Sequence, residues 1–324
     1  MILTLLTHLI FSLGFLPLFP YEMGSVERRA LKEKEAAVID FQGAFSLWRR
    51  GAEPIGQTGN FKEPVKADMT SAGVVTSAVS AIVVDRVSGA VLFEKNSETS
   101  RSIGSITKLM TAYVFLETKP DLSSPAFLIA EDVRLGGAQH MRIDDPLTVR
   151  DLFLASLVGS DNTATAALVR LSGMPMGDFV ARMNELAAEF GLWGTMFVDP
   201  AGLSVENRSI APDVARLLDR VLENEEIRSA TELQEVSIIS GSGRTYRVES
   251  TNELLLGFLN KPPYKIVGGK TGFLPEAGYC FGAVVSREGA GEILVVVLGS
   301  ESKYGRFQDA KALAAWAFKA YRWP

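Results

Sequence analysis

The sequence predicts a mixed α/β (α+β) domain in which a mainly antiparallel sheet is sandwiched by helices. Strand patterns occur near residues 80–95 and again over 236–299, while apolar residues at helical spacing fill the segment between them. The 324 residues are 47% hydrophobic and 22% charged, a composition typical of a folded globular chain. Since the strands lie at both ends of this region, the sheet must combine distant segments, and a helical subdomain is expected from about 120 to 225.

The N-terminus begins with a mostly apolar run that has no charged residue in positions 1–20. Its length predicts an export signal or a membrane anchor, although the first basic residues, Arg28 and Arg29, follow the run instead of preceding it. A mis-assigned start or an interfacial helix is the alternative. Glycine and proline recur in the next stretch, so residues 21–75 are expected to form a spacer and residues 76–324 the folded domain.

Within the folded domain, hydrophobic periodicity predicts the order of the elements. Two β-rich runs, 81–85 and 91–94, flank a glycine turn and predict a hairpin. Apolar residues three and four apart predict a buried helix that begins at or beside Ser105 and ends before Pro120. The same patterns predict further helices over 152–157, 164–171, 179–190, 212–222 and 308–321, and strands over 236–239, 245–248, 279–285 and 293–298.

Charge and residue counts exclude several functional classes. The 38 acidic residues outnumber the 33 basic ones, and the basic residues are interleaved with acidic ones, which argues against nucleic-acid binding. Cys280 is the single cysteine, so no intrachain disulfide forms, and with only His8 and His140 a zinc site of histidine and cysteine is excluded. We expect no metal and no cofactor. His140 is expected to be a loop residue outside the chemistry, so the base of a hydrolase would not be histidine.

Ser105 and Lys108 form a Ser-x-x-Lys motif at the start of the predicted buried helix. Residues three apart share one helix face, so the lysine amine could accept the serine proton if burial and a second cation kept it neutral. Alone the motif is a weak signal, because a second match from Ser300 to Lys303 has no apolar helix around it.

Two tripeptides make the signal specific. Ser160-Asp161-Asn162 lies between two predicted helices, where its residue types suit a helix cap. Lys270-Thr271-Gly272 lies just before the last predicted pair of strands. With Ser-x-x-Lys, these three motifs make the sequence resemble the penicillin-recognising serine transferases.

The resemblance is closer to the low-molecular-mass D-alanyl-D-alanine carboxypeptidases and endopeptidases, and it covers roughly residues 76–323. Besides the motifs, it rests on the runs Asp199–Leu203 and Ala277–Cys280 and on Arg306 before the last helix. It implies the fold of β-lactamases and D,D-peptidases. It also implies a peptidoglycan stem peptide as substrate, β-lactams as inhibitors, and an extracytoplasmic location to which residues 1–20 direct or anchor the chain.

The resemblance further implies a mechanism through an acyl-enzyme. Ser105 would attack the peptide carbonyl, Lys108 would take its proton, and Ser160 would pass a proton to the leaving amine. The backbone N–H groups of Ser105 and Phe273 would hold the oxyanion. Lys270 would keep Lys108 deprotonated and attract the substrate carboxylate. The implied substrate-binding residues are Asn162, Lys270, Thr271, Gly272, Phe273 and Arg306.

Three alternatives stay open at this stage. Leu274 replaces a threonine that many relatives use to contact the substrate carboxylate, so carboxypeptidase and endopeptidase activity are both possible. A class A-like β-lactamase would need a Glu-x-x-Leu-Asn loop after Ser160, where we find the run from Asp199 instead. A catalytically silent muropeptide- or penicillin-binding module would not need the intact pair Ser105 and Lys108.

Overall fold

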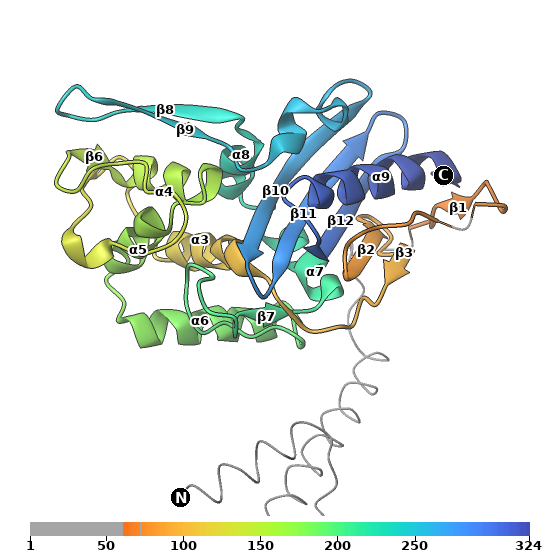
Figure 1. The fold of residues 1–324 in the computed structure, drawn as a ribbon, viewed down its shortest axis with the longest axis horizontal. Helices are drawn as coiled ribbons and strands as arrows, with labels where there is room; N and C mark the ends of the chain where they lie inside the picture. The colour runs from red at the N-terminus through yellow and green to blue at the C-terminus, as the bar shows by residue number, and fades with distance from the viewer. Residues whose placement is uncertain (1–60, 72) are drawn as a thin grey trace, which may run out of the picture. The chain divides into compact units, whose positions relative to one another are not determined.

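The computed structural model describes residues 61–71 and 73–324, so the predicted apolar segment 1–20 lies outside the described residues. The centre of the fold is a five-stranded sheet in the order β10-β11-β12-β2-β3, with every neighbouring pair antiparallel (Figure 1). Its strands are β2 (Ser80–Asp85), β3 (Val91–Lys95), β10 (Tyr264–Leu274), β11 (Gly278–Arg287) and β12 (Gly291–Ser300). The register sets Val83 opposite Val295, which joins the N-terminal hairpin to the C-terminal strands.

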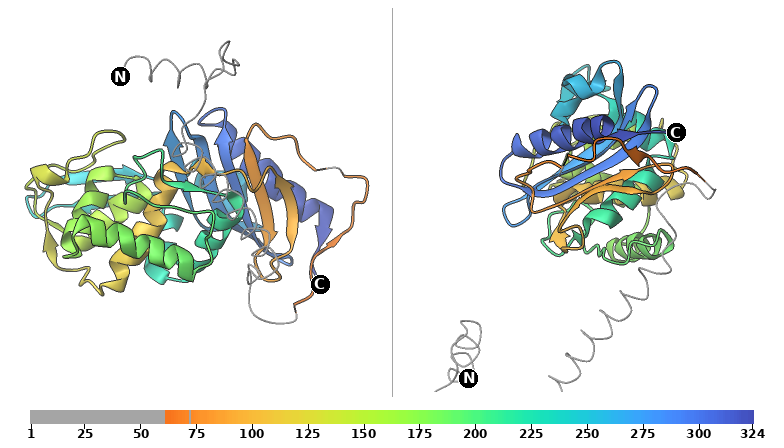
Figure 2. Two further views of the ribbon diagram at one scale, coloured as in Figure 1. Left: turned by 90° about the horizontal axis from the view of Figure 1, so that it is seen from below. Right: turned by 90° about the vertical axis from the view of Figure 1, so that its right-hand side faces the viewer.

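Helices cover both faces of this sheet, as the two views of Figure 2 show. Successive strand residues point to opposite faces, so Val83 packs in the core cluster of helix α9 (Gly305–Ala320), while Val84 packs in that of α7 (Ala211–Val221). Both faces are therefore apolar, which explains the nearly continuous hydrophobic runs in β2 and β12. The predicted antiparallel sheet between helices is confirmed.

The helical part surrounds one buried helix, α3 (Lys108–Glu117), which a single 3-10 turn (Gly104–Thr107) precedes. Periodicity predicted this helix and its start correctly. The helices around it are α4 (Val149–Val158), α5 (Asn162–Leu171), α6 (Met176–Glu189) and α8 (Glu225–Glu232). The first three confirm predicted helices, with slightly longer bounds, whereas α8 was not predicted from the sequence.

One expectation about strands is wrong. The pair β8 (Glu235–Ile239) and β9 (Thr245–Glu249) forms a separate hairpin beside α4 instead of joining the central sheet (Figure 1). The alternating pattern of these two segments predicts strands but does not determine their pairing partners. The Lys270 motif lies just before β11 and β12, as expected, but it does so inside β10, a strand that was not predicted. The sequence did not predict this strand because it contains three glycines, at positions 268, 269 and 272, and glycine is rare in strand interiors.

Short pairings complete the described chain. Val65 and Lys66, inside the expected spacer, form β1 and pair with β13 (Tyr321–Arg322) beyond the last helix. The division of the chain at residue 75 stays a prediction. Two more pairings connect β4 (Arg101–Ser102) with β7 (Arg208–Ser209) and β5 (Pro125–Ala126) with β6 (Leu147–Thr148).

Over residues 61–71 and 73–324, no helix has the length and apolar character needed to cross a membrane.

Candidate active site

Ser105 lies in the 3-10 turn before α3, where the sheet meets the helical part. The backbone on either side of it is tightly packed. A Cβ built on Gly104 would lie 2.7 Å from the backbone nitrogen of Phe273, so the turn directly contacts strand β10. A Cβ on Gly202 would lie 2.1 Å from the Gly104 oxygen. Only glycine permits this approach at position 202, and the run from Asp199 thereby supports the turn that carries Ser105.

Lys108 is fully buried one helical turn after Ser105. Its Nζ lies within hydrogen-bond distance of three oxygens: Ser105 Oγ at 2.8 Å, Asn162 Oδ1 at 2.7 Å and the Ala201 backbone carbonyl at 2.6 Å. The amide oxygen and the carbonyl can only accept. A neutral amine has two N–H bonds and one lone pair, so these two acceptors use both hydrogens and leave the lone pair directed at the Ser105 hydroxyl.

Burial lowers the pKa of Lys108 to about 7, although the nearby charges of Asp199 and Asp161 oppose the shift. The neutral amine is therefore well populated near neutral pH. Burial also lowers the pKa of Lys270, and the like charges of Lys108 and Arg306 lower it further. The expectation from the sequence, that the charge of Lys270 keeps the pKa of Lys108 low, needs correction, because burial is the largest cause of the shift.

Ser160 faces the site from the turn between α4 and α5. Its backbone has a φ of 58°, a left-handed conformation that is uncommon for a residue with a side chain. Lys270 Nζ donates to Ser160 Oγ at 2.8 Å and to the Thr271 carbonyl at 3.2 Å. Because the serine oxygen accepts from Lys270, the serine hydrogen is free to point into the cleft.

Asn162 begins α5 and lies between Lys108 and a loop. Its Nδ2 donates to the Gly136 carbonyl at 2.6 Å, opposite the oxygen that contacts Lys108. Asp161 caps the same helix, since its Oδ1 accepts from the backbone N–H groups of Thr163 and Ala164. The expectation that this motif suits a helix cap is confirmed by Asp161.

The Lys270 motif, on strand β10, forms another wall of the site. A Cβ on Gly272 would lie 2.1 Å from the Ile103 carbonyl, so glycine is needed here for packing against the turn of Ser105. Arg306 Nη1 donates to the Gly272 carbonyl at 3.2 Å from the first turn of α9, inside the helix that it was expected to precede. Thr271 Oγ1 donates to Thr251 Oγ1 at 2.7 Å.

A cleft of about 750 Å³ joins these walls. The predicted residues that line it are Ser105, Ser160, Asn162, Thr271, Gly272, Phe273 and Arg306, while Lys108 and Lys270 lie buried beneath it. Three partners of the motif side chains were not predicted from the sequence: Gly136, Ala201 and Thr251. Ala201 belongs to the quoted run from Asp199, which is a usable signal, but nothing local marks the other two.

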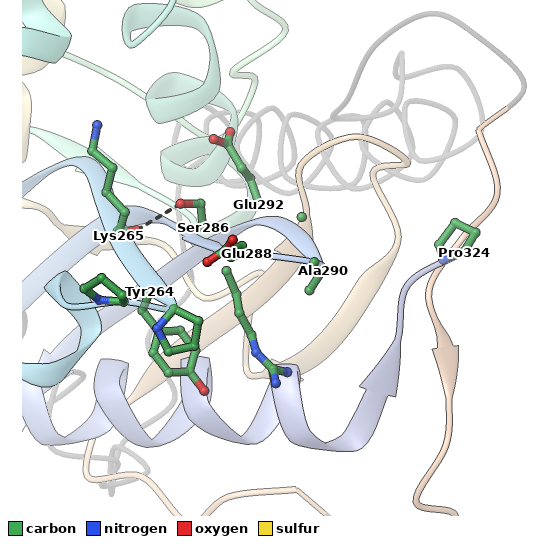
Figure 3. Close-up of a pocket in the computed structure, with 12 residues that line it drawn as sticks. Tyr264, Lys265, Ser286, Glu288, Ala290, Glu292 and Pro324 are labelled. Carbon is green, nitrogen blue, oxygen red and sulfur yellow. Dashed lines mark hydrogen bonds between the residues drawn. The ribbon is translucent and has the colours of Figure 1, made fainter.

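A second hollow of about 750 Å³ lies at the far ends of β10, β11 and β12 (Figure 3). Its lining includes Tyr264, Lys265, Glu288 and Glu292 and none of the motif residues. Among the residues that the structure describes, no cluster of three or more histidine, cysteine, aspartate or glutamate side chains could hold a metal ion.

Comparisons with known proteins agree with this geometry. Residues 67–302 match the family described as D-alanyl-D-alanine carboxypeptidase. A D-alanyl-D-alanine endopeptidase of Pseudomonas aeruginosa is 32% identical over 257 residues, which cover 75% of this chain and 81% of the relative. The Streptomyces K15 DD-transpeptidase structure is 25% identical, with a TM-score of 0.70, over 77% of this chain and 100% of that one. Penicillin-binding protein D2 of Listeria monocytogenes, bound to cefotaxime, is 30% identical, with a TM-score of 0.66, over 76% and 100%.

Proposed function

Because this chain belongs to the D-alanyl-D-alanine carboxypeptidase family of serine-type hydrolases, we propose that it cleaves peptidoglycan stem peptides through an acyl-enzyme on Ser105. The observation that carries the proposal is the 2.8 Å contact between Lys108 Nζ and Ser105 Oγ. The lysine is buried, and because its pKa is about 7, a neutral amine is available as the base near neutral pH. The resemblance and the fold class expected from the sequence are both confirmed.

In the first step, the Lys108 lone pair takes the Ser105 hydroxyl proton while Ser105 Oγ bonds to the carbonyl carbon of the substrate. The carbonyl electron pair moves to oxygen, and the backbone N–H groups of Ser105 and Phe273 would stabilise that charge. The contact of Gly104 with the Phe273 nitrogen supports this pairing of N–H groups, because it holds the two backbone segments against each other.

In the second step, the bond between carbonyl carbon and nitrogen breaks as the leaving amine gains a proton. Ser160 is placed to deliver it, since its oxygen accepts from Lys270 and its hydrogen is free. The proton that Lys108 took from Ser105 then restores the Ser160 hydroxyl, while Ser105 remains acylated. Water hydrolyses the ester by the same route in reverse, which returns Ser105 to its starting form.

The cations around the cleft account for recognition of a carboxylate next to the scissile bond. Arg306 supplies a positive charge and Thr271 a hydroxyl on one wall, and the buried Lys270 donates to Ser160 from the same strand as Thr271. The edge of β10 at Gly272 offers backbone groups to an extended peptide. Leu274 removes one hydroxyl from that wall, so both a terminal D-alanine and a cross-linked residue stay candidates for the leaving group.

One experiment tests the proposal and separates its two forms. Purified protein is incubated with a pentapeptide ending in D-Ala-D-Ala and, separately, with a D,D-cross-linked muropeptide, and the products are identified by mass. Loss of one alanine marks a carboxypeptidase, and two monomers from the muropeptide mark an endopeptidase. The Ser105→Ala variant is the control and should leave both substrates intact. Failure of the unmodified protein to cleave either substrate would refute the proposal.

Peptidoglycan lies outside the cytoplasmic membrane, so we propose that the domain acts there and that residues 1–20 export or anchor it. The support is the uncharged apolar run in the sequence. Residues 1–75 fused to an enzyme that is active only outside the cytoplasm should give an active fusion, in the membrane fraction if the segment is an anchor. An inactive fusion retained inside the cell would contradict the export role.

A further inference from the structure

The loop from residue 134 to residue 140 forms one rim of the cleft and is held by the Ser160-Asp161-Asn162 motif at two points. Gly136 accepts from Asn162 Nδ2 at 2.6 Å. Four residues later, the backbone N–H of His140 donates to Asp161 Oδ2 at 2.8 Å, and His140 Nδ1 lies 3.1 Å from the same oxygen. The loop and the catalytic motif are thus one hydrogen-bonded unit.

The His140 ring is packed against the turn that carries the motif. Its side chain is only 17% exposed, and a Cβ built on Gly159 would lie 2.6 Å from the ring Cε1. The Asp161 carboxylate is completely buried. Its Oδ1 caps α5, so among the described residues His140 alone donates hydrogen bonds to Oδ2. Removing the ring would leave this buried oxygen with a backbone partner only, which is costly for a charged group.

The loop in turn decides which way the Asn162 amide faces. The Gly136 carbonyl can only accept, so it requires the amide NH2 on its side and leaves Oδ1 toward Lys108. If Gly136 moved away, the amide could rotate and present NH2 to Lys108. Two donors would then face each other, and the Lys108 lone pair would no longer be directed at Ser105.

We propose that His140 is a positioning residue for acylation, which acts by holding the loop whose Gly136 carbonyl orients the Asn162 amide. The inference rests on the proposed function, since it concerns the base of that reaction. It also revises the sequence-based expectation for His140: the residue lies in a loop, as expected, but it contributes to the chemistry through Asp161 and Asn162. The ring itself does not touch the reacting atoms.

The test compares two substitutions at this position with a control in the same loop. His140→Asn keeps a donor where Nδ1 stands, whereas His140→Leu keeps volume without a donor. Gln139→Ala is the control, because among the described residues the hydrogen bond of the Gln139 side chain goes to the Met141 carbonyl, directly after the loop, and not to the Ser160-Asp161-Asn162 motif. For each, we would measure the rate of acylation of Ser105 by a labelled penicillin across pH 5–9, together with the melting temperature.

We expect His140→Leu to slow acylation at least about tenfold, because small displacements of catalytic groups have effects of this size. Its pH midpoint should move below that of the unmodified protein, since losing the Asn162 oxygen destabilises charged Lys108, while Asp199, Asp161 and Lys270 remain in place around it. His140→Asn and Gln139→Ala should stay within about threefold. A purely structural role would lower the melting temperature without moving the midpoint.

Acylation of His140→Leu at the unmodified rate and midpoint would overturn the inference, as would equal loss in His140→Asn. If His140→Leu does not fold, Asp161→Asn tests the same contact, because it keeps the oxygen that caps α5 and replaces the one that accepts from His140. Because the Asp161 charge itself raises the pKa of Lys108, the readout for this variant is the acylation rate on the plateau above the midpoint. We expect a loss of at least about tenfold there, and an undiminished plateau rate would contradict us. Unmodified protein that is not acylated at Ser105 would refute the proposed function instead, so the two failures are distinguishable.

Discussion

Lys270 Nζ lies 2.8 Å from Ser160 Oγ, although 110 residues separate the two in the chain. The contact joins strand β10 of the sheet to the turn between two helices of the helical part. The sheet therefore supplies Lys270, whereas the helical part supplies Ser105, Lys108 and Ser160. The geometry of the site depends on packing that holds these two parts together.

Lys108→Arg should abolish acylation of Ser105 by a labelled penicillin. The substitution keeps a positive charge, but a guanidinium stays protonated at any usable pH and cannot accept the serine proton. Loss of a general base typically slows a reaction by about 10²–10⁴-fold. The measurement is the rate of label incorporation, with circular dichroism to show that the variant is folded. Acylation of the arginine variant at an undiminished rate would remove Lys108 from the mechanism.

The pH dependence of acylation follows from the same lysine. Its pKa is lowered to about 7, and only the neutral amine can accept the proton. The rate should therefore rise with pH through a midpoint near 7 and level off above it. Single-turnover acylation measured from pH 5 to 9 gives this profile. A rate that is independent of pH, or that falls as pH rises through 7, would be incompatible with a neutral lysine base.

Gly202→Ala should damage both stability and activity. A Cβ there would lie 2.1 Å from the Gly104 oxygen, so the turn that carries Ser105 must shift. Gly173→Ala is a matched control, because Gly173 has a similar φ of +74° against +76° but no neighbour within 4 Å of the added carbon. The control should cost about 1 kcal/mol of unfolding free energy, the usual cost of a left-handed alanine.

Urea unfolding and acylation kinetics of the two glycine variants separate two effects of the added methyl group: the cost of the left-handed backbone conformation and the clash with Gly104. We expect Gly202→Ala to lose clearly more unfolding free energy than Gly173→Ala and to be acylated at least about tenfold more slowly. Equal losses in the two variants would mean that the contact with Gly104 does not hold the serine turn.

Asp213 should make the stability depend on pH. Burial raises the pKa of this carboxyl to about 6, against the opposing hydrogen bonds from Thr195 and Gly194. A raised acid pKa means that the native state binds the proton more tightly than the unfolded state does. Protonated Asp213 thus stabilises the native state fully below about pH 4. This stabilisation, roughly 3 kcal/mol in total, is lost as the pH rises from about 4 to 6.

Comparison with Asp213→Asn isolates this effect from other carboxyl groups. Between pH 4 and pH 7, the unmodified protein should lose roughly 3 kcal/mol of unfolding free energy relative to the asparagine variant. Chemical denaturation at several pH values gives both free energies. A difference that stays constant over this range would contradict the raised pKa.

Sequence patterns predicted the helices, strands and motif residues that depend on interactions between residues close together in the chain. The apolar spacing after Ser105 predicted α3 because one face of that helix must be buried, and the three motifs predicted the side chains of the cleft. Strand β10 escaped prediction because its glycines serve close contacts, such as that of Gly272 with Ile103, and not strand propensity. The link from His140 to Asp161 depends on a contact 21 residues apart that no spacing rule reveals.

The central claim is that Ser105 becomes acylated, and intact-protein mass spectrometry after incubation with penicillin tests it most directly. We expect one stable adduct, which peptide mapping assigns to Ser105, and no adduct on the Ser105→Ala variant. An adduct mapped to Ser160 or Ser300, or no adduct at all, would contradict it. Hydrolysed penicillin released faster than peptide is turned over would mean that the chain works as a β-lactamase.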